Sequence, residues 1–156
     1  MKTKRTKPRR DAGIRRRALA SSAEACPVCD GALRERRGAL RYPVNGEDIV
    51  VGSTTFQQCA DCKEKFLRLD DARRLQEAAI ENYRHKYGLL SAGEIRSIRE
   101  RLGMTQAAMA GILRLGANTL SRWESGRNVQ SAALDVLLRM IRDVPECLRY
   151  LRRQAA

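Results

Sequence analysis

The stretch Leu102–Gly126, which reads LGMTQAAMAGILRLGANTLSRWESG, indicates the fold of the C-terminal half of the chain. Its glycines and hydroxyl residues divide it into short helices, because Gly103 is suited to end one helix and Thr105 to cap the next. Just upstream, apolar residues fall on one helical face at Ile95, Ile98 and Leu102. Everything after residue 90 is therefore predicted to be a set of short helices.

A third helix is predicted to start near Gly116 and to have two different faces. Leu120 and Trp123 lie three residues apart and point inward, while the outward residues are Asn118, Ser121 and Arg122. A helix with an apolar back and a short polar, cationic front is suited to the major groove of DNA. Asn118 can pair with adenine and Arg122 with guanine. A solvated helix face is the plain alternative.

These three helices resemble the Xre/Cro-type helix-turn-helix. The residues in register are Leu102, Thr105, Gln106, Met109, Ala110, Thr119, Leu120, Ser121, Trp123, Glu124 and Gly126. The match implies a five-helix DNA-binding domain, in which Gln106 lies at a helix N-terminus near a phosphate. Gly116 departs from the pattern, since the family usually has serine there. Four arginines are also assigned to phosphates, namely Arg96, Arg99, Arg114 and Arg127.

Four of the five cysteines form two Cys-x-x-Cys pairs, at Cys26, Cys29, Cys59 and Cys62. A two-residue spacer lets one tight turn aim two sulfurs at one point, and Zn²⁺ favours four thiolates in a tetrahedron. The pattern predicts a structural zinc site. An iron–sulfur cluster stays open as an alternative, whereas disulfides are disfavoured without an export signal. Cys147 has no partner and is expected in the core of the last helix.

The segment between the two pairs is predicted to be a β-hairpin. Two β-type runs, 39–44 and 47–51, flank Asn45-Gly46, the favoured pair for a type I′ turn. Residues 54–57 are a candidate third strand. About 40 residues with few large apolar side chains need the free energy of metal binding to fold.

A linker helix is expected to follow, from Leu69-Asp70 to Gly88. Asp70 can cap it, and an apolar face is predicted at Leu75, Ala79, Tyr83 and Tyr87. The fold class is thus α+β with two domains. The predicted divisions are a disordered basic tail at 1–25, a zinc-binding domain with its linker helix at 26–88, and a helix-turn-helix domain at 89–156.

The charge of the chain points to an acidic polymer as partner. Its 156 residues include 31 Lys and Arg against 18 Asp and Glu, a formal net charge of +13. The first 25 residues read as a basic arm for phosphates or as a solubilising tail. No apolar run approaches the roughly 18 residues of a membrane helix, and no signal peptide is evident, so we expect a cytoplasmic protein that joins the nucleoid when bound to DNA.

The order of cysteine module, linker helix and helix-turn-helix resembles the MqsA family of antitoxins. The resemblance implies that the four cysteines bind structural Zn²⁺ and that Asn118 and Arg122 read bases. It also implies a dimer formed through the C-terminal domain, repression of its own operon at a palindrome, and a small ribonuclease toxin held by the N-terminal module. The basic tail is not part of the family pattern.

Two further features bear on function. The last two helices carry more apolar residues than one small domain needs, which favours a dimer, although they also serve the monomer core: Leu134, Leu137, Leu138, Ile141, Leu148 and Leu151. An enzyme is disfavoured, because a closed Cys₄ set leaves no open metal position and the one histidine, His85, lies in the linker helix. The alternative to an antitoxin is a zinc-stabilised Xre-type regulator without a toxin.

Overall fold

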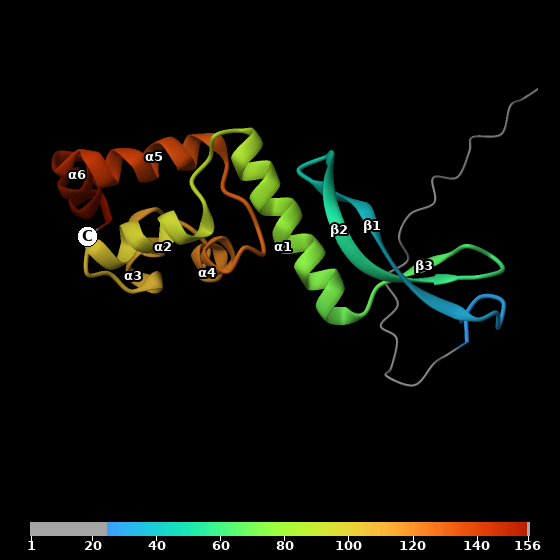
Figure 1. The fold of residues 1–156 in the computed structure, drawn as a ribbon. Coiled ribbons are helices and arrows are strands. Elements are labelled where there is room, and N and C mark those ends of the chain that lie inside the picture. The colour runs from blue at the N-terminus through green and yellow to red at the C-terminus, as the bar shows by residue number, and fades with distance from the viewer. Residues whose placement is uncertain (1–24, 156) are drawn as a thin grey trace, which may run out of the picture. The chain divides into compact units, whose positions relative to one another are not determined.

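A computed structural model describes residues 25–155 of the chain, so the predicted tail lies almost wholly outside the described residues. Three strands come first: β1 (Leu33–Val44), β2 (Glu47–Cys59) and β3 (Lys65–Phe66). The helices follow as α1 (Leu69–Lys86), α2 (Ala92–Arg101), α3 (Gln106–Ile112), α4 (Thr119–Glu124), α5 (Ala132–Asp143) and α6 (Pro145–Ala155) (Figure 1). The predicted α+β class, with a small sheet before the helices, is confirmed.

The described residues form two compact units. The first, here the zinc unit, holds the described residues 25–38 together with Thr55–Ala72. The second, here the helical unit, holds Ala39–Thr54 and the chain from Arg73 onward. The tip of the hairpin and most of α1 therefore belong with the C-terminal helices. Whether the chain also divides at residue 88 into independently folding domains stays a prediction.

The hairpin turn at Asn45-Gly46 has the backbone that the sequence predicts. Asn45 has φ of 50° and Gly46 has φ of 83°, and a type I′ turn needs positive φ at both positions. The third strand, however, is not residues 54–57, because β2 continues through them, even though Ser53 just before them has φ of 50°. The third strand is β3, which pairs antiparallel with β2 and places Phe66 opposite Gln57.

The buried face of α1 includes Leu75 and Ala79, as predicted, but not Tyr87. Its buried residues are Leu75, Ala79, Ile80 and Arg84, whereas Tyr87 is 51% exposed. A helix has 3.6 residues per turn, so each step of four residues rotates the face by about 40°. Three such steps carry Tyr87 away from the stripe that starts at Leu75. Its hydroxyl instead donates to the Glu47 carboxylate at 2.6 Å.

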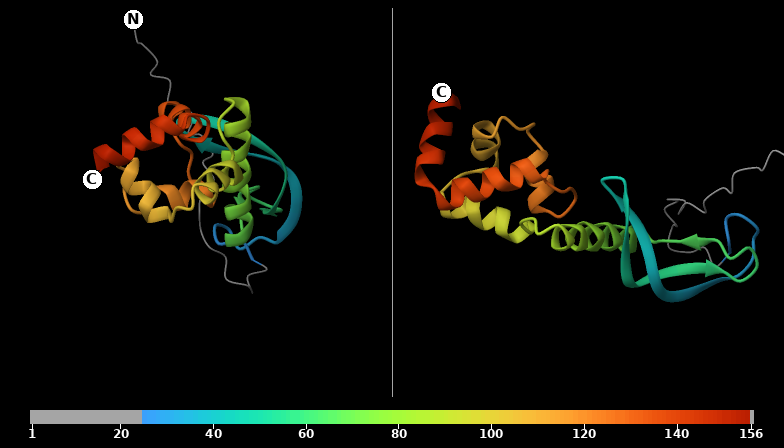
Figure 2. Two further views of the ribbon diagram at one scale, coloured as in Figure 1. Left: turned by 90° about the vertical axis from the view of Figure 1, so that its left-hand side faces the viewer. Right: turned by 90° about the horizontal axis from the view of Figure 1, so that it is seen from above.

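Helices α2 to α6 enclose one apolar core (Figure 2). The helix boundaries follow from caps: Ser91 and Glu94 form a capping box at the start of α2, Gly103 at φ of 64° follows its end, and Thr105 caps α3. The buried residues of the core are Leu90, Ile95, Ile98, Met109, Ala110, Leu113, Leu120, Trp123, Leu138 and Ile141. Cys147 packs against this core, as the sequence predicts for it.

None of the helices between residues 25 and 155 combines the length and the apolar character needed to cross a membrane.

Candidate metal centre and nucleic-acid interface

The four paired cysteines meet at one point of the zinc unit. Their sulfur atoms all lie within 4.8 Å of one another. The contacts cross between the pairs, with Cys26 Sγ 3.6 Å from Cys62 Sγ and Cys29 Sγ 3.5 Å from Cys59 Sγ. Cys26 and Cys59 are buried, while Cys29 and Cys62 are exposed.

Both cysteine pairs adopt the same local turn. In each turn a backbone N–H donates to the first sulfur at 3.4 Å, from Val28 to Cys26 and from Asp61 to Cys59. The first cysteine of each pair also donates its own N–H five residues ahead, from Cys26 to Gly31 O at 2.7 Å and from Cys59 to Glu64 O at 3.0 Å. These turns aim two sulfurs from each pair at a common centre.

The donor set fits a divalent metal ion. Although burial, the largest influence, raises the pKa of Cys59, hydrogen bonds from the Asp61 and Cys62 backbone and from neighbouring thiols lower this pKa to about 7. The pKa of Cys62 is raised to about 12: a backbone hydrogen bond from Glu64 lowers it, but burial and the other three thiols outweigh that bond. Four thiolates this close repel one another unless a cation neutralises them. The four cysteines are thus the ligands of a structural Zn²⁺ site.

Gly31 is a residue of this centre that the sequence patterns do not single out. A Cβ built there would lie 2.0 Å from Asp61 Oδ2 and 3.0 Å from Cys59 Sγ. The exposed Asp61 carboxylate can swing toward solvent, but a bound metal ion would hold the Cys59 sulfur in place. A glycine two residues after a Cys-x-x-Cys pair was the available signal.

We expect Gly31→Ala to weaken zinc binding about tenfold, because the new methyl group displaces a ligand sulfur. Competition with a coloured zinc chelator measures the affinity directly. The matched control is Gly93→Ala in α2, where a Cβ meets nothing within 4 Å. Equal zinc affinity in both variants would show that the close approach at Gly31 has no importance for the metal.

The recognition surface predicted on the third helix lies on α4. This helix begins at Thr119 rather than near Gly116, and the Asn118 side chain makes no capping bond. Within the described residues, neither Asn118 nor Arg122 uses its side chain in a hydrogen bond, and both are exposed. Ser121 is half-buried, and its hydroxyl donates to the Asn118 carbonyl at 3.0 Å. Leu120 and Trp123 are buried behind them.

Glu124, at the end of α4, is the centre of a buried polar cluster. Arg99 donates to both of its carboxylate oxygens, through Nε at 2.7 Å and Nη2 at 2.9 Å. The Gln106 amide nitrogen donates to it at 2.8 Å. Burial, the largest influence, raises the pKa of Glu124, but these bonds and the charge of Arg96 outweigh it and lower the pKa below its usual value. The carboxylate is therefore ionised at neutral pH and ties α4 to α2 and α3.

The residues assigned to phosphates are found in three settings. Arg99 and Gln106 are engaged with Glu124, and Arg96 lies beside them with its guanidinium donating to the Glu124 carbonyl at 3.2 Å. Arg114 donates to the Gln154 carbonyl at 2.9 Å, and Arg127 donates to the Ser125 hydroxyl at 3.0 Å. Their contacts with DNA stay predictions.

Comparison with known proteins agrees with this combination of sites. The sequence model of the MqsA family, described as the antitoxin component of a bacterial toxin–antitoxin system, matches residues 24–152. The chain is 25% identical to antitoxin MqsA of Escherichia coli K12 over 130 residues, 81% of this chain and 98% of that protein. It is 36% identical to antitoxin HigA-2 of Vibrio cholerae serotype O1 over 62 residues, 40% of this chain and 60% of that protein. Because the family match spans most of the described residues and includes all four zinc ligands, the chain belongs to the MqsA family of antitoxins.

Proposed function

We propose that this antitoxin binds a palindromic operator as a dimer and represses its own operon. We further propose that its N-terminal zinc-binding domain neutralises a small ribonuclease toxin by direct contact. The DNA-reading part is carried by one observation. The Asn118 amide and the Arg122 guanidinium are exposed on a helix whose other side is fixed in the core by Leu120 and Trp123. Side chains that are held ready in this way, without internal partners among the described residues, suit direct reading of base edges.

Asn118 and Arg122 lie four residues apart, one turn of helix, and so follow the same groove. The Asn118 amide can form two hydrogen bonds with one adenine, and the Arg122 guanidinium can form two with one guanine. The Ser121 hydroxyl, already donating to Asn118 O, offers its lone pairs at the same surface. Sequence preference then comes from these side chains, and the +13 net charge adds a general, salt-sensitive attraction.

Phosphate contacts are proposed for the exposed cations beside α4. Arg127 follows the helix, and Arg114 precedes it, with both side chains at the surface. Arg96 is exposed, with 53% of its side chain accessible. Gln106 can still offer its amide oxygen and its backbone N–H, whereas Arg99 acts mainly through Glu124 and keeps α4 in place.

The dimer surface is proposed on α5, and not on the leucines singled out from the sequence. Those leucines and Ile141 lie in or against the core of the helical unit. By contrast Val136, Met140 and Val144 recur every four residues and are 41 to 56% exposed. An exposed apolar stripe of this kind is suited to contact a second copy of the chain, as two operator half-sites require.

The toxin partner separates this proposal from its alternative, a zinc-stabilised regulator without a toxin. Both relatives found are named antitoxins, which supports a toxin partner for this chain. A short co-transcribed reading frame whose product co-purifies with the chain would support the antitoxin. An operon that encodes no binding protein would favour the regulator.

Arg122→Ala tests the DNA-reading part. We expect it to relax the base preference at one position in each half-site and to cost about 1–3 kcal/mol of operator binding. Binding to a panel of operators with single base changes measures this by fluorescence anisotropy. The control is Arg73→Ala, an exposed arginine of α1 that belongs neither to the proposed DNA surface nor to the proposed dimer surface. If Arg122→Ala weakens specific and random DNA equally, Arg122 reads no base.

A further inference from the structure

We propose that Arg84, in the linker helix α1, is a positioning residue for DNA recognition: it holds the C-terminal end of α4 and the loop after it, and thereby sets where Asn118 and Arg122 are presented. The inference rests on the proposed function, that α4 reads DNA. It assigns part of the recognition apparatus to a helix that precedes the helix-turn-helix segment.

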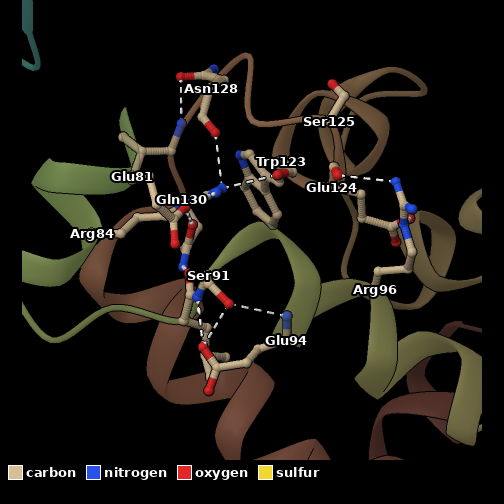
Figure 3. Close-up of polar contacts among 12 residues, drawn as sticks. Glu81, Arg84, Ser91, Glu94, Arg96, Trp123, Glu124, Ser125, Asn128 and Gln130 are labelled. Carbon is tan, nitrogen blue, oxygen red and sulfur yellow. Dashed lines mark hydrogen bonds and ion pairs between the residues drawn. The ribbon is translucent and has the colours of Figure 1, made fainter. Parts of the chain in front are cut away.

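Arg84 is buried at the C-terminal end of α4, although it belongs to α1 (Figure 3). Its side chain is 1% exposed. Nη2 donates to the Trp123 carbonyl at 3.0 Å and to the Asn128 carbonyl at 3.1 Å. Nε donates to Gln130 Oε1 at 3.3 Å, and Nη1 to Glu81 at 3.4 Å. One guanidinium thus bonds to backbone on both sides of the turn that ends α4.

The burial of this charge is costly, which indicates a specific role. Burial is the largest influence on the Arg84 guanidinium and lowers its pKa. A buried cation is tolerated only when its donors are satisfied, and here all three guanidinium nitrogens have partners. Within the described residues, no buried side-chain nitrogen or oxygen lacks a hydrogen-bond partner.

Helix α4 depends on such outside contacts because it is short. It has six residues and no side-chain bond at its N-terminal cap. A helix of this length leaves most of its backbone groups outside its own hydrogen-bond ladder, so neighbouring side chains must satisfy them. A cation at its C-terminal end also complements the helix dipole. Glu124 anchors α4 to α2 and α3, and Arg84 anchors its last turn to α1.

A second residue of α1 holds the same loop. Gln76 Nε2 donates to the Arg127 carbonyl at 3.2 Å, so α1 contacts the carbonyls of residues 123, 127 and 128. Behind Arg84, the Gln130 amide continues the cluster by donating to the Leu90 carbonyl at 2.7 Å and to Asp135 at 3.0 Å. The loop between α4 and α5 is therefore fixed on both sides.

Base recognition makes this fixing important. Side chains that read bases must be held within about 0.5 Å of the productive geometry. A lysine at position 84 retains the charge but has one ammonium group in place of the planar fork, so it cannot reproduce the two bonds to the Trp123 and Asn128 carbonyls together with the bond to Gln130. The end of α4 would shift, and Asn118 and Arg122 would shift with it.

The test compares Arg84→Lys with Arg73→Lys, the same substitution at an exposed position of the same helix. Fluorescence anisotropy of the full chain gives the Kd for the DNA upstream of its own gene and for a scrambled duplex, each corrected for the folded fraction. We expect Arg84→Lys to reduce the preference for the upstream DNA about tenfold, with an unchanged salt dependence, because a buried residue meets no phosphate. Arg73→Lys is expected to keep the wild-type preference.

A purely structural role would lower the thermal stability but leave the preference of the folded molecules unchanged, and that result would overturn the proposal. If Arg84→Lys does not fold, Gln76→Ala decides, with an expected two- to threefold loss of preference; an unchanged preference there also overturns it. A wild-type protein without preference for the upstream DNA would instead refute the proposed function itself.

Discussion

Cys59→Ser is expected to abolish stable zinc binding and to unfold the zinc unit while the helical unit stays folded. Cys59 is buried at the metal centre and contacts Cys29 at 3.5 Å. A serine hydroxyl is a poor ligand for Zn²⁺, and structural zinc sites supply about 10–16 kcal/mol, so the loss is several kcal/mol. Metal analysis gives the zinc content, and the fluorescence of Trp123, the one tryptophan, reports on the helical unit.

The matched control is Cys147→Ser, since Cys147 is half-buried and is not one of the four clustered cysteines. It should keep one zinc ion per chain. Loss of the Trp123 signal together with zinc in Cys59→Ser would mean that the two units fold cooperatively. That result would refute the predicted division of the chain near residue 88.

Glu124→Gln is expected to destabilise the helical unit by about 3 kcal/mol. The Glu124 side chain is 1% exposed, and its partner Arg99 is 13% exposed. Removing one partner of a buried ion pair leaves the other charge buried without compensation, which is among the costliest single changes. Urea unfolding followed by Trp123 fluorescence measures the free energy of unfolding. Glu124 also holds the amide of Gln106, for which we propose a phosphate contact. Glu124→Gln should therefore weaken operator binding as well as lower the stability.

The pH dependence provides an independent check. Since Arg99 and Gln106 outweigh burial and hold the pKa of Glu124 below its usual 4.5, its contribution to stability is complete above pH 4.5. It is lost as the pH falls through the lower pKa of the folded state. The wild type and Glu124→Gln should therefore converge in stability on acidification. Glu100→Gln, at an exposed partner of Arg99, should cost less than about 1 kcal/mol, and an equal cost would contradict the assignment.

The parts of the fold that sequence could predict have local signals. Asn45-Gly46 specifies its turn through backbone φ, and Thr105 specifies the start of α3 through its cap. The cysteine spacing places four sulfurs at one centre, although the hydrogen bonds that shape the two turns become visible only in three dimensions. The family resemblance, confirmed by the match over residues 24–152, extends this local information across the chain.

The parts that sequence missed depend on long-range contacts. An arginine in an amphipathic helix reads as a surface residue, so nothing marks Arg84 as buried until Gln130 and two carbonyls surround it. Leu134 and Leu137 look like spare apolar surface, but they pack against the core, and Val136 and Met140 are exposed instead. For Gly31 the signal was present, but its meaning depends on how closely Cys59 approaches it.

The central claim, that the chain reads a specific DNA sequence, is tested most directly by binding of the wild-type protein. Fluorescence anisotropy across a salt series compares the DNA upstream of its own gene with a scrambled duplex. We predict a preference for the upstream DNA that persists as salt rises, because base contacts release no counterions. Equal affinity for both duplexes, falling steeply with salt, would contradict the claim and would mean that the +13 charge accounts for all DNA binding.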